Sequence, residues 1–132
     1  MRISFLALGA SALVLAFAAA GCGGGSSNDT LSYSDFGTQA DQLCSQGEAA
    51  VKAANLGPSD LAKFGQIIQP YVDRLKALKA PDELKSAQSD FVSISEQQID
   101  AANKGDEKTV ESLSAQSDAA GSKMGAPACA KS

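Results

Sequence analysis

The sequence predicts an all-α fold, an antiparallel up-down-up-down four-helix bundle with a kinked second helix, stapled by one disulfide. Apolar residues recur at helical spacing in four segments, separated by short stretches rich in Gly, Pro, Asn and Asp. Ala and Leu are abundant, whereas the 132 residues include no Trp, two Tyr and five Phe, which favours packed helices over a sheet. Cys44 and Cys129 lie in the first segment and near the end of the chain, where a bond would connect the two.

The first helix is predicted to begin at Tyr33. Ser32 is a favourable N-cap, and Asp35 can complete a capping box with it. Apolar or small residues then recur at helical spacing as far as Ala54. The helix should end there, because residues 55–58 read Asn-Leu-Gly-Pro.

The second helix is predicted to follow Ser59-Asp60, and its apolar stripe is the most regular in the chain. Pro70 lies inside this stripe, lacks a backbone N–H and clashes with the preceding turn, so either the helix kinks or two shorter helices meet. We favour a kink, since the stripe keeps its phase across the proline. The stripe consists of Leu61, Phe64, Ile68, Tyr71, Leu75 and Leu78.

Two more helices are predicted in the last third of the chain. Pro81 and the two acids that follow it are typical of a helix start, and Lys104-Gly105 of a helix end. Asp106 should cap the fourth helix, and residues 126–132 are interpreted as a tail held mainly by Cys129. The serine-containing face of the fourth helix either packs closely or is an incomplete core that needs a partner; its serines are Ser114, Ser117 and Ser122.

Short connections between four helices imply antiparallel neighbours, which brings the end of the fourth helix near the start of the first. Cys44 lies about 16 Å along the first helix from Tyr33, at about 1.5 Å per residue. The fourth helix is shorter, so the residues after Met124 can reach Cys44. Two remaining cysteines of an exported protein most often pair. Two free thiols stay an open alternative, while a metal site is disfavoured because the chain has no His.

The first 21 residues have the layout of an export signal. Arg2 supplies a positive start, an almost continuous apolar run follows, and small residues precede Cys22. This ending resembles the lipobox of bacterial lipoproteins, although Ala19 stands where Leu is common. The resemblance implies that Cys22 becomes the lipid-modified mature N-terminus, carrying acyl chains such as palmitate. Two interpretations stay open: ordinary secretory cleavage after Ala18-Ala19-Ala20, and a retained helical anchor.

The chain is therefore divided into three parts. Residues 1–21 are the predicted lipoprotein signal peptide, 22–31 a lipid-anchored Gly/Ser-rich linker, and 32–132 the helical bundle domain. We expect an exported protein that is anchored to the bacterial cell membrane, with its domain on the extracytoplasmic side.

Several features of the mature chain occur together in a fixed order. They are a Tyr-led first helix with Cys44, the Gln69-Pro70 interruption, Ala80-Pro81-Asp82-Glu83-Leu84, the Lys104-Gly105-Asp106 turn and Cys129. In this layout the chain resembles a group of small exported bacterial helical proteins, many with lipoboxes, whose function is not established. The resemblance covers nearly all of the mature chain and brings no catalytic residues.

Composition excludes several kinds of activity. The net charge of −4 argues against nucleic-acid binding and against an electrostatic hold on anionic lipid. The absence of His removes imidazole bases, Ser-His and Cys-His nucleophile pairs and His-ligated metals. Acidic doublets lie in predicted first turns, where the helix dipole accounts for them. We therefore expect no enzyme, no catalytic residue, no cofactor and no metal site.

The leading hypothesis is a non-enzymatic, membrane-anchored envelope lipoprotein whose helical domain binds another envelope protein. The alternative is a carrier for a small apolar or amphipathic ligand, held in an interhelical cleft beside Pro70. A pocket of a few hundred cubic ångströms would favour the carrier, although filling a core is the commoner use of such a stripe. The predicted cleft residues are Phe64, Ile68, Tyr71 and Phe91.

Overall fold

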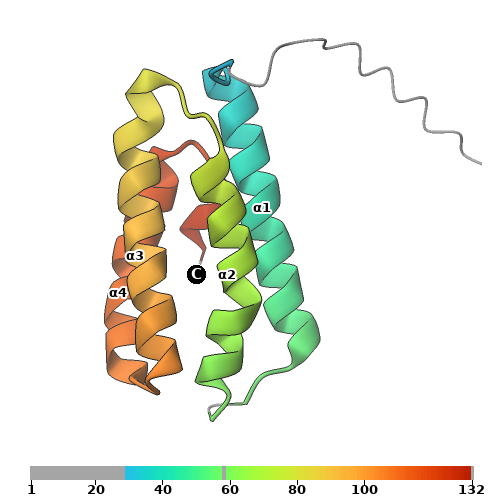
Figure 1. The fold of residues 1–132 in the computed structure, drawn as a ribbon, viewed down its shortest axis with the longest axis vertical. Coiled ribbons are helices and arrows are strands. Elements are labelled where there is room, and N and C mark those ends of the chain that lie inside the picture. Colours follow the sequence, from blue (N-terminus) through green and yellow to red (C-terminus); the bar gives the residue numbers. More distant parts are fainter. Residues whose placement is uncertain (1–28, 58, 132) are drawn as a thin grey trace, which may run out of the picture.

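The computed structural model describes residues 29–57 and 59–131, which fold into four α-helices that lie side by side (Figure 1). No strand occurs in these residues, so the all-α prediction is confirmed. The predicted signal peptide, Cys22 and residues 22–28 of the linker lie outside them. In chain order the elements are α1 (Tyr33–Ala54), α2 (Leu61–Ala77), the short 3-10 helix η1 (Asp82–Leu84), α3 (Lys85–Asn103), α4 (Glu107–Lys123) and the 3-10 helix η2 (Pro127–Ala130).

Side-chain caps define the starts of α1 and α4. Ser32 accepts a hydrogen bond from the backbone N–H of Asp35 (3.1 Å) and donates its hydroxyl to the Asp35 carboxylate (2.6 Å), which closes the predicted capping box. Asn55, in the left-handed region at φ 46°, ends α1. At the start of α4, Asp106 accepts the hydroxyl and the backbone N–H of Thr109, and these bonds lower the pKa of its carboxyl group.

Helix α2 runs through Pro70 without interruption, which excludes the alternative of two shorter helices. Pro70 and Gln66 are both exposed. Water can therefore satisfy the Gln66 carbonyl, which lacks the N–H that a residue other than proline would supply. The helix ends at Ala77, one residue before the last position of the predicted stripe.

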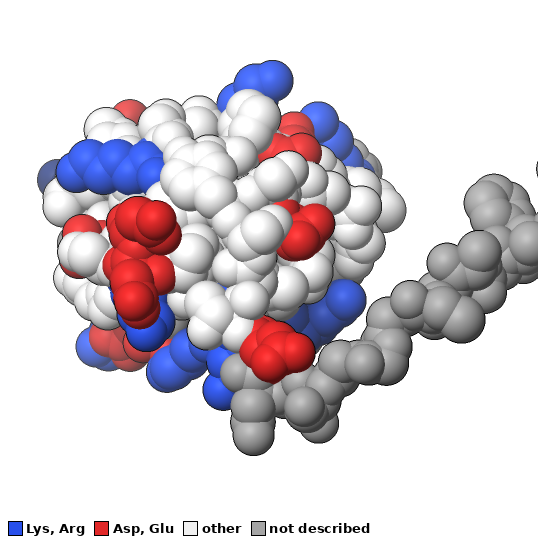
Figure 2. Space-filling view, turned by 90° about the horizontal axis from the view of Figure 1, so that it is seen from above, with Lys and Arg blue, Asp and Glu red and all other residues white. Residues whose placement is uncertain are grey.

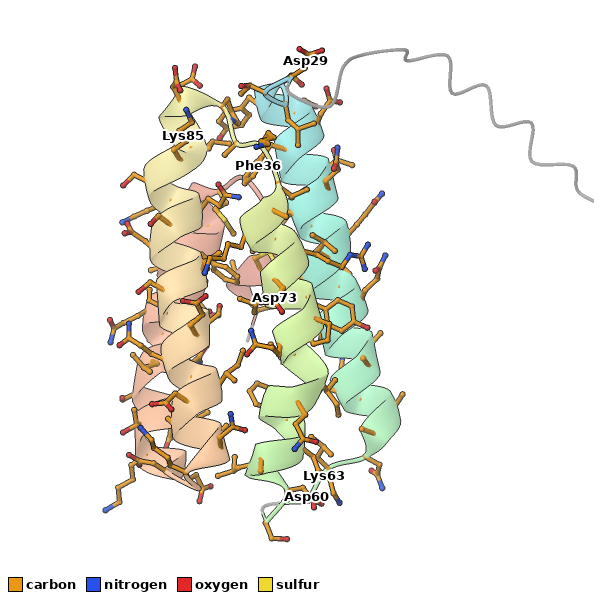
Figure 3. All side chains as sticks on the ribbon, viewed as in Figure 1. Asp29, Phe36, Asp60, Lys63, Asp73 and Lys85 are labelled. Carbon is orange, nitrogen blue, oxygen red and sulfur yellow. A yellow bond between two sulfur atoms is a disulfide. The ribbon has the colours of Figure 1, made fainter. Side chains whose placement is uncertain are left out.

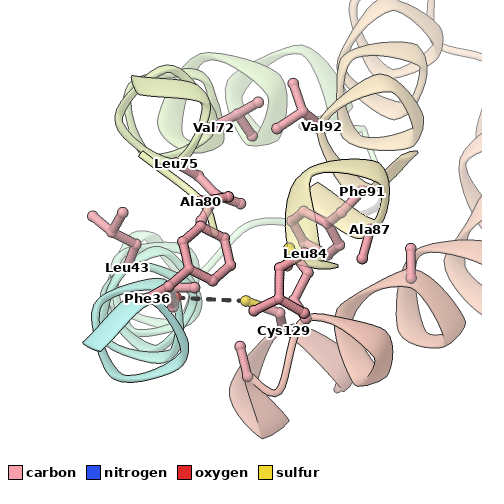
Figure 4. Close-up of a cluster of buried hydrophobic side chains, with 14 of the residues drawn as sticks. Phe36, Leu43, Val72, Leu75, Ala80, Leu84, Ala87, Phe91, Val92 and Cys129 are labelled. Atoms are coloured by element: carbon pink, nitrogen blue, oxygen red, sulfur yellow. Dashed lines mark hydrogen bonds between the residues drawn. The ribbon is translucent and has the colours of Figure 1, made fainter. Parts of the chain in front are cut away.

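Most of the core lies toward the end of the molecule where α1 begins, at the top of Figure 1. Phe36, Leu75 and Met124 are its largest fully buried side chains, and Figure 4 shows how the side chains converge there from different helices. The cluster consists of Phe36, Ala40, Leu43, Val72, Leu75, Ala80, Leu84, Ala87, Phe91, Val92, Ile99, Ala120, Met124, Ala126 and Cys129.

On the face of the molecule seen in Figure 2, acidic and basic side chains lie among one another and among uncharged residues. Asp60 and Lys63 pair at 2.9 Å at the start of α2 (Figure 3), and Lys76 of α2 pairs with Glu96 of α3 at 2.8 Å. Water and salt screen such exposed pairs, so they contribute little to stability. The apolar core and the C-terminal segment hold the helices together.

The C-terminal segment, residues 124–131, occupies one side of the bundle. Helix α2 packs against α1 and α3, and α3 packs against α4, whereas η2 contacts both α1 and α4. Helices α1 and α4 form no comparable interface with each other. The segment therefore acts as a spacer that closes the bundle between its first and last helices.

Both a covalent bond and hydrogen bonding hold this segment against α1. Cys44 and Cys129 form the predicted disulfide, with Cα atoms 5.1 Å apart. The backbone N–H of Ala128 donates to Asp41 Oδ1 at 2.6 Å, and Ala126 is fully buried. The dashed line in Figure 4 joins Cys129 Sγ to the Ala40 carbonyl oxygen (3.5 Å); a disulfide sulfur carries no proton, so this is a contact. The prediction of a tail held mainly by its cysteine was thus incomplete.

Gly121 allows the C-terminal segment to lie directly on α4. A Cβ atom at Gly121 would lie 2.3 Å from the carbonyl oxygen of Cys129 and 2.5 Å from its carbonyl carbon. On α1, a Cβ atom at Gly37 would lie 3.0 Å from the carbonyl oxygen of Gly125. Both close approaches are to backbone, which cannot move aside as a flexible side chain can.

Gly121→Ala is expected to destabilise the oxidised protein by about 1–3 kcal/mol, because the segment must move away from α4 to admit the methyl group. Urea unfolding at 25 °C measures the difference. Gly57→Ala is the matched control, since a Cβ there would meet only the Asp60 carboxylate at 3.5 Å. Equal unfolding midpoints for the two variants would contradict the close packing of the segment on α4.

Candidate functional site

A cavity of about 420 Å³ lies among the four helices and opens to solvent. Its size falls within the range of small-molecule pockets, about 300–1,000 Å³. Its walls are mostly apolar, and each helix supplies part of them together with the C-terminal segment. The lining residues are Leu43, Cys44, Gly47, Glu48, Val51, Lys52, Phe64, Ile68, Tyr71, Val72, Leu75, Phe91, Ser95, Gln98, Ile99, Val110, Ser114, Ser117, Ala128, Cys129 and Lys131.

Small residues at inward-facing positions leave this space open. Gly47 on α1 and Ser95, Ser114 and Ser117 on α3 and α4 line the cavity where a close-packed bundle would carry larger apolar side chains. A Cβ atom at Gly47 would lie 3.4–3.5 Å from the side chains of Ile68 and Tyr71, so α1 lies close to α2 here. The C-terminal segment spaces α1 from α4 and fills only part of the gap between them.

All four predicted cleft residues line this cavity. Phe64, Ile68 and Tyr71 project from α2 and are half-buried, and buried Phe91 projects from α3. Their role in holding a ligand stays a prediction. Pro70 itself is exposed and does not line the cavity, whereas its chain neighbour Tyr71 does.

The cavity walls that α1 and α4 supply were not predicted from the sequence. Gly47 lies in the first predicted helix, and Ser114 and Ser117 belong to the serine-containing face of the fourth. That face is neither closely packed throughout nor wholly exposed. Ser114 and Ser117 line the cavity, whereas Ser122 is exposed and donates to the carbonyl of Asp118 (2.9 Å).

Polar groups on α3 and α4 give the cavity one wall of mixed character. Ser95, Gln98 and Ser117 are only 5%, 8% and 3% exposed. The side-chain amide of Gln98 donates to the carbonyl of Val110 and to the hydroxyl of Ser114, each at 3.4 Å. Ser114 in turn donates to the Val110 carbonyl at 3.2 Å. A serine in a helix can donate its hydroxyl to the carbonyl four residues earlier in this way. With its hydroxyl satisfied by the backbone, such a wall accommodates apolar as well as polar groups.

Three charged side chains lie at the edge of the cavity. The Lys52 ammonium donates to the Glu48 carboxylate at 2.5 Å. This hydrogen bond and the Lys52 charge lower the pKa of Glu48, and the charge of Lys131 acts in the same direction. Glu48 is therefore ionised at neutral pH, and the edge carries two positive charges and one negative charge. Lys131 forms no ion pair with the described residues.

Residues 29–57 and 59–131 contain neither a candidate metal centre nor a candidate membrane-spanning helix. They contain no group of three or more His, Cys, Asp or Glu side chains arranged to hold a metal ion. None of their helices has the length and apolar character needed to cross a bilayer. Comparisons of the chain with protein-family models, curated proteins and solved structures gave no match. The cavity is thus the feature from which function is inferred.

Proposed function

We propose that this chain is an exported, lipid-anchored carrier whose helical domain binds a small apolar or amphipathic ligand without chemical conversion. The observation that supports it is the open, mostly apolar cavity of about 420 Å³ lined by Phe64, Ile68, Tyr71 and Phe91. Concave, apolar sites with a few polar groups are the usual form of small-molecule sites.

The arrangement that we propose for the domain is an antiparallel up-down-up-down bundle. Neighbouring helix ends support it, since the N–H of Leu31, before α1, donates to the carbonyl of Lys79, after α2 (2.8 Å). Gly65 near the start of α2 likewise lies against Asn103 at the end of α3. In such a bundle the inward faces of all four helices meet, and ligand sites form between them.

Binding of an envelope protein was the leading expectation from the sequence, and we now place it second. A second hollow on the outer face of α3 and α4 is bordered by both charged and apolar side chains, among them Asp90, Ile94 and Lys123. This second hollow lacks the enclosing walls of the larger cavity. The larger cavity offers a ligand contacts from four helices and from the C-terminal segment.

A lipid anchor would give such a carrier direct access to amphiphiles that leave the membrane. Cys22 and the Gly/Ser-rich residues after it support this arrangement, because a tethered domain needs slack to reach its ligand. Two acyl chains hold a protein where a single chain gives marginal binding.

Ligand binding is tested with the neutral fluorescent probe N-phenyl-1-naphthylamine. The full-length oxidised protein is expected to bind it, and Ser95→Leu to weaken binding at least tenfold, because the new side chain fills the cavity. Ser89→Leu, on the exposed side of the same helix, is the matched control. Ser117→Leu supplies a second cavity-filling variant should Ser95→Leu fold poorly.

Unchanged affinity in well-folded Ser95→Leu and Ser117→Leu variants would contradict the carrier proposal, as would a failure of the wild-type chain to bind the probe. Urea unfolding of each variant shows whether it is folded.

The anchoring proposal is tested by metabolic labelling with palmitate. Cys22→Ala is expected to lose the label and to remain unprocessed or leave the lipid-modified fraction, because the thioether bond requires the thiol. Ser26→Ala, in the same linker, should retain label and processing. A mature protein that begins at Gly21 with an unmodified Cys22 would contradict the proposal.

A further inference from the structure

We propose that the ligand of the cavity is a fatty carboxylate, with its single hydrocarbon chain among the helices and its carboxylate at Lys52 and Lys131. This inference rests on the proposed carrier function and names the ligand class. It combines the volume of the cavity with the charges at its edge.

The volume fits one hydrocarbon chain. A water molecule takes about 30 Å³ of liquid, and a methylene group is of similar size, so 420 Å³ holds on the order of ten to fifteen methylene groups. Apolar side chains of α1 and α2 form one side of the cavity, including Val51, Phe64 and Ile68. Each methylene group removed from water strengthens binding roughly fourfold.

The charge at the edge fits a single negative group. Lys52 is paired with Glu48, whereas Lys131 has no ion-pair partner among the described residues, so these three side chains sum to one positive charge. The whole chain has a net charge of −4, so this edge opposes the overall sign. A monoanion complements the edge, while the second charge of a phosphate would be repelled by Glu48.

The disulfide also affects the position of Lys131, one of the two lysines proposed to bind the ligand's carboxylate. Lys131 follows Cys129 by two residues, and both line the cavity with Cys44. The bond between the cysteines holds the end of η2 against α1. Lys131, two residues further on, is close enough to Glu48 for its charge to lower the pKa of that carboxyl group. The segment that spaces α1 from α4 therefore also supplies a cation at the edge of the resulting cavity.

Displacement of N-phenyl-1-naphthylamine from the full-length oxidised protein tests the head group with three compounds of equal chain length. Dodecanoate is expected to bind about tenfold more tightly than uncharged dodecanol, and more tightly than dodecyl phosphate. Lys52→Ala and Lys131→Ala should each weaken dodecanoate binding about threefold and leave dodecanol binding unchanged, since only the carboxylate meets these charges. Glu48→Gln should strengthen dodecanoate binding.

Lys104→Ala is the matched control, because Lys104 pairs with Asp100 four residues earlier, as Lys52 does with Glu48, yet does not line the cavity. If the probe binds and Ser95→Leu blocks it, but dodecanol equals dodecanoate, the carboxylate inference is overturned while the carrier proposal stands. If dodecyl phosphate binds more tightly than dodecanoate, the choice of a carboxylate as the head group is overturned. Failure of the probe to bind would instead count against the carrier proposal itself.

Discussion

The bond between Cys44 and Cys129 is the constraint on which the remaining structure depends. It joins residues 85 positions apart and holds the C-terminal segment against α1, while Gly121 lets the same segment lie on α4. Helices α1 and α4 form no extensive interface of their own, so the bundle closes on this side through the segment. The chain-entropy account assigns a loop of this length about 4.5 kcal/mol, a large part of the stability of a small domain.

The same arrangement explains why a cavity exists in so small a protein. The C-terminal segment fills the gap between α1 and α4 only along its own length. Further along the helices, small residues leave the interior open, namely Gly47, Ser95, Ser114 and Ser117. Unfilled apolar space costs stability, because its lining atoms lose contacts that a packed core would provide. The core around Phe36 and Met124, whose side chains are fully buried, offsets that cost together with the disulfide.

The sequence predicted the helices well, because caps such as Ser32 and Asp106 and the apolar stripes act locally. The disulfide was predictable because two cysteines remain beside Cys22 in a chain whose sequence predicts export. The packing of η2 on Gly121 was not, since it depends on contacts between segments distant in sequence. Ser95 and Gln98 were not predicted to face inward, because polar side chains do not fit the apolar pattern of a helix, whereas the apolar Ile94 beside them is only half-buried. Phe64, Ile68 and Tyr71 were found because a regular stripe marks one wall of any interior space, filled or open.

Hydrogen exchange after selective reduction of the disulfide tests most directly whether the C-terminal segment holds α1 and α4 in place. Without the bond, the C-terminal segment should detach from α1. Helix α4 should then lose its contacts with η2. Exchange is therefore expected to rise first in residues 110–131, with α2 and α3 lagging because they pack against each other directly. An equal rise in all four helices, or unchanged protection of residues 110–131 in the reduced protein, would contradict this account.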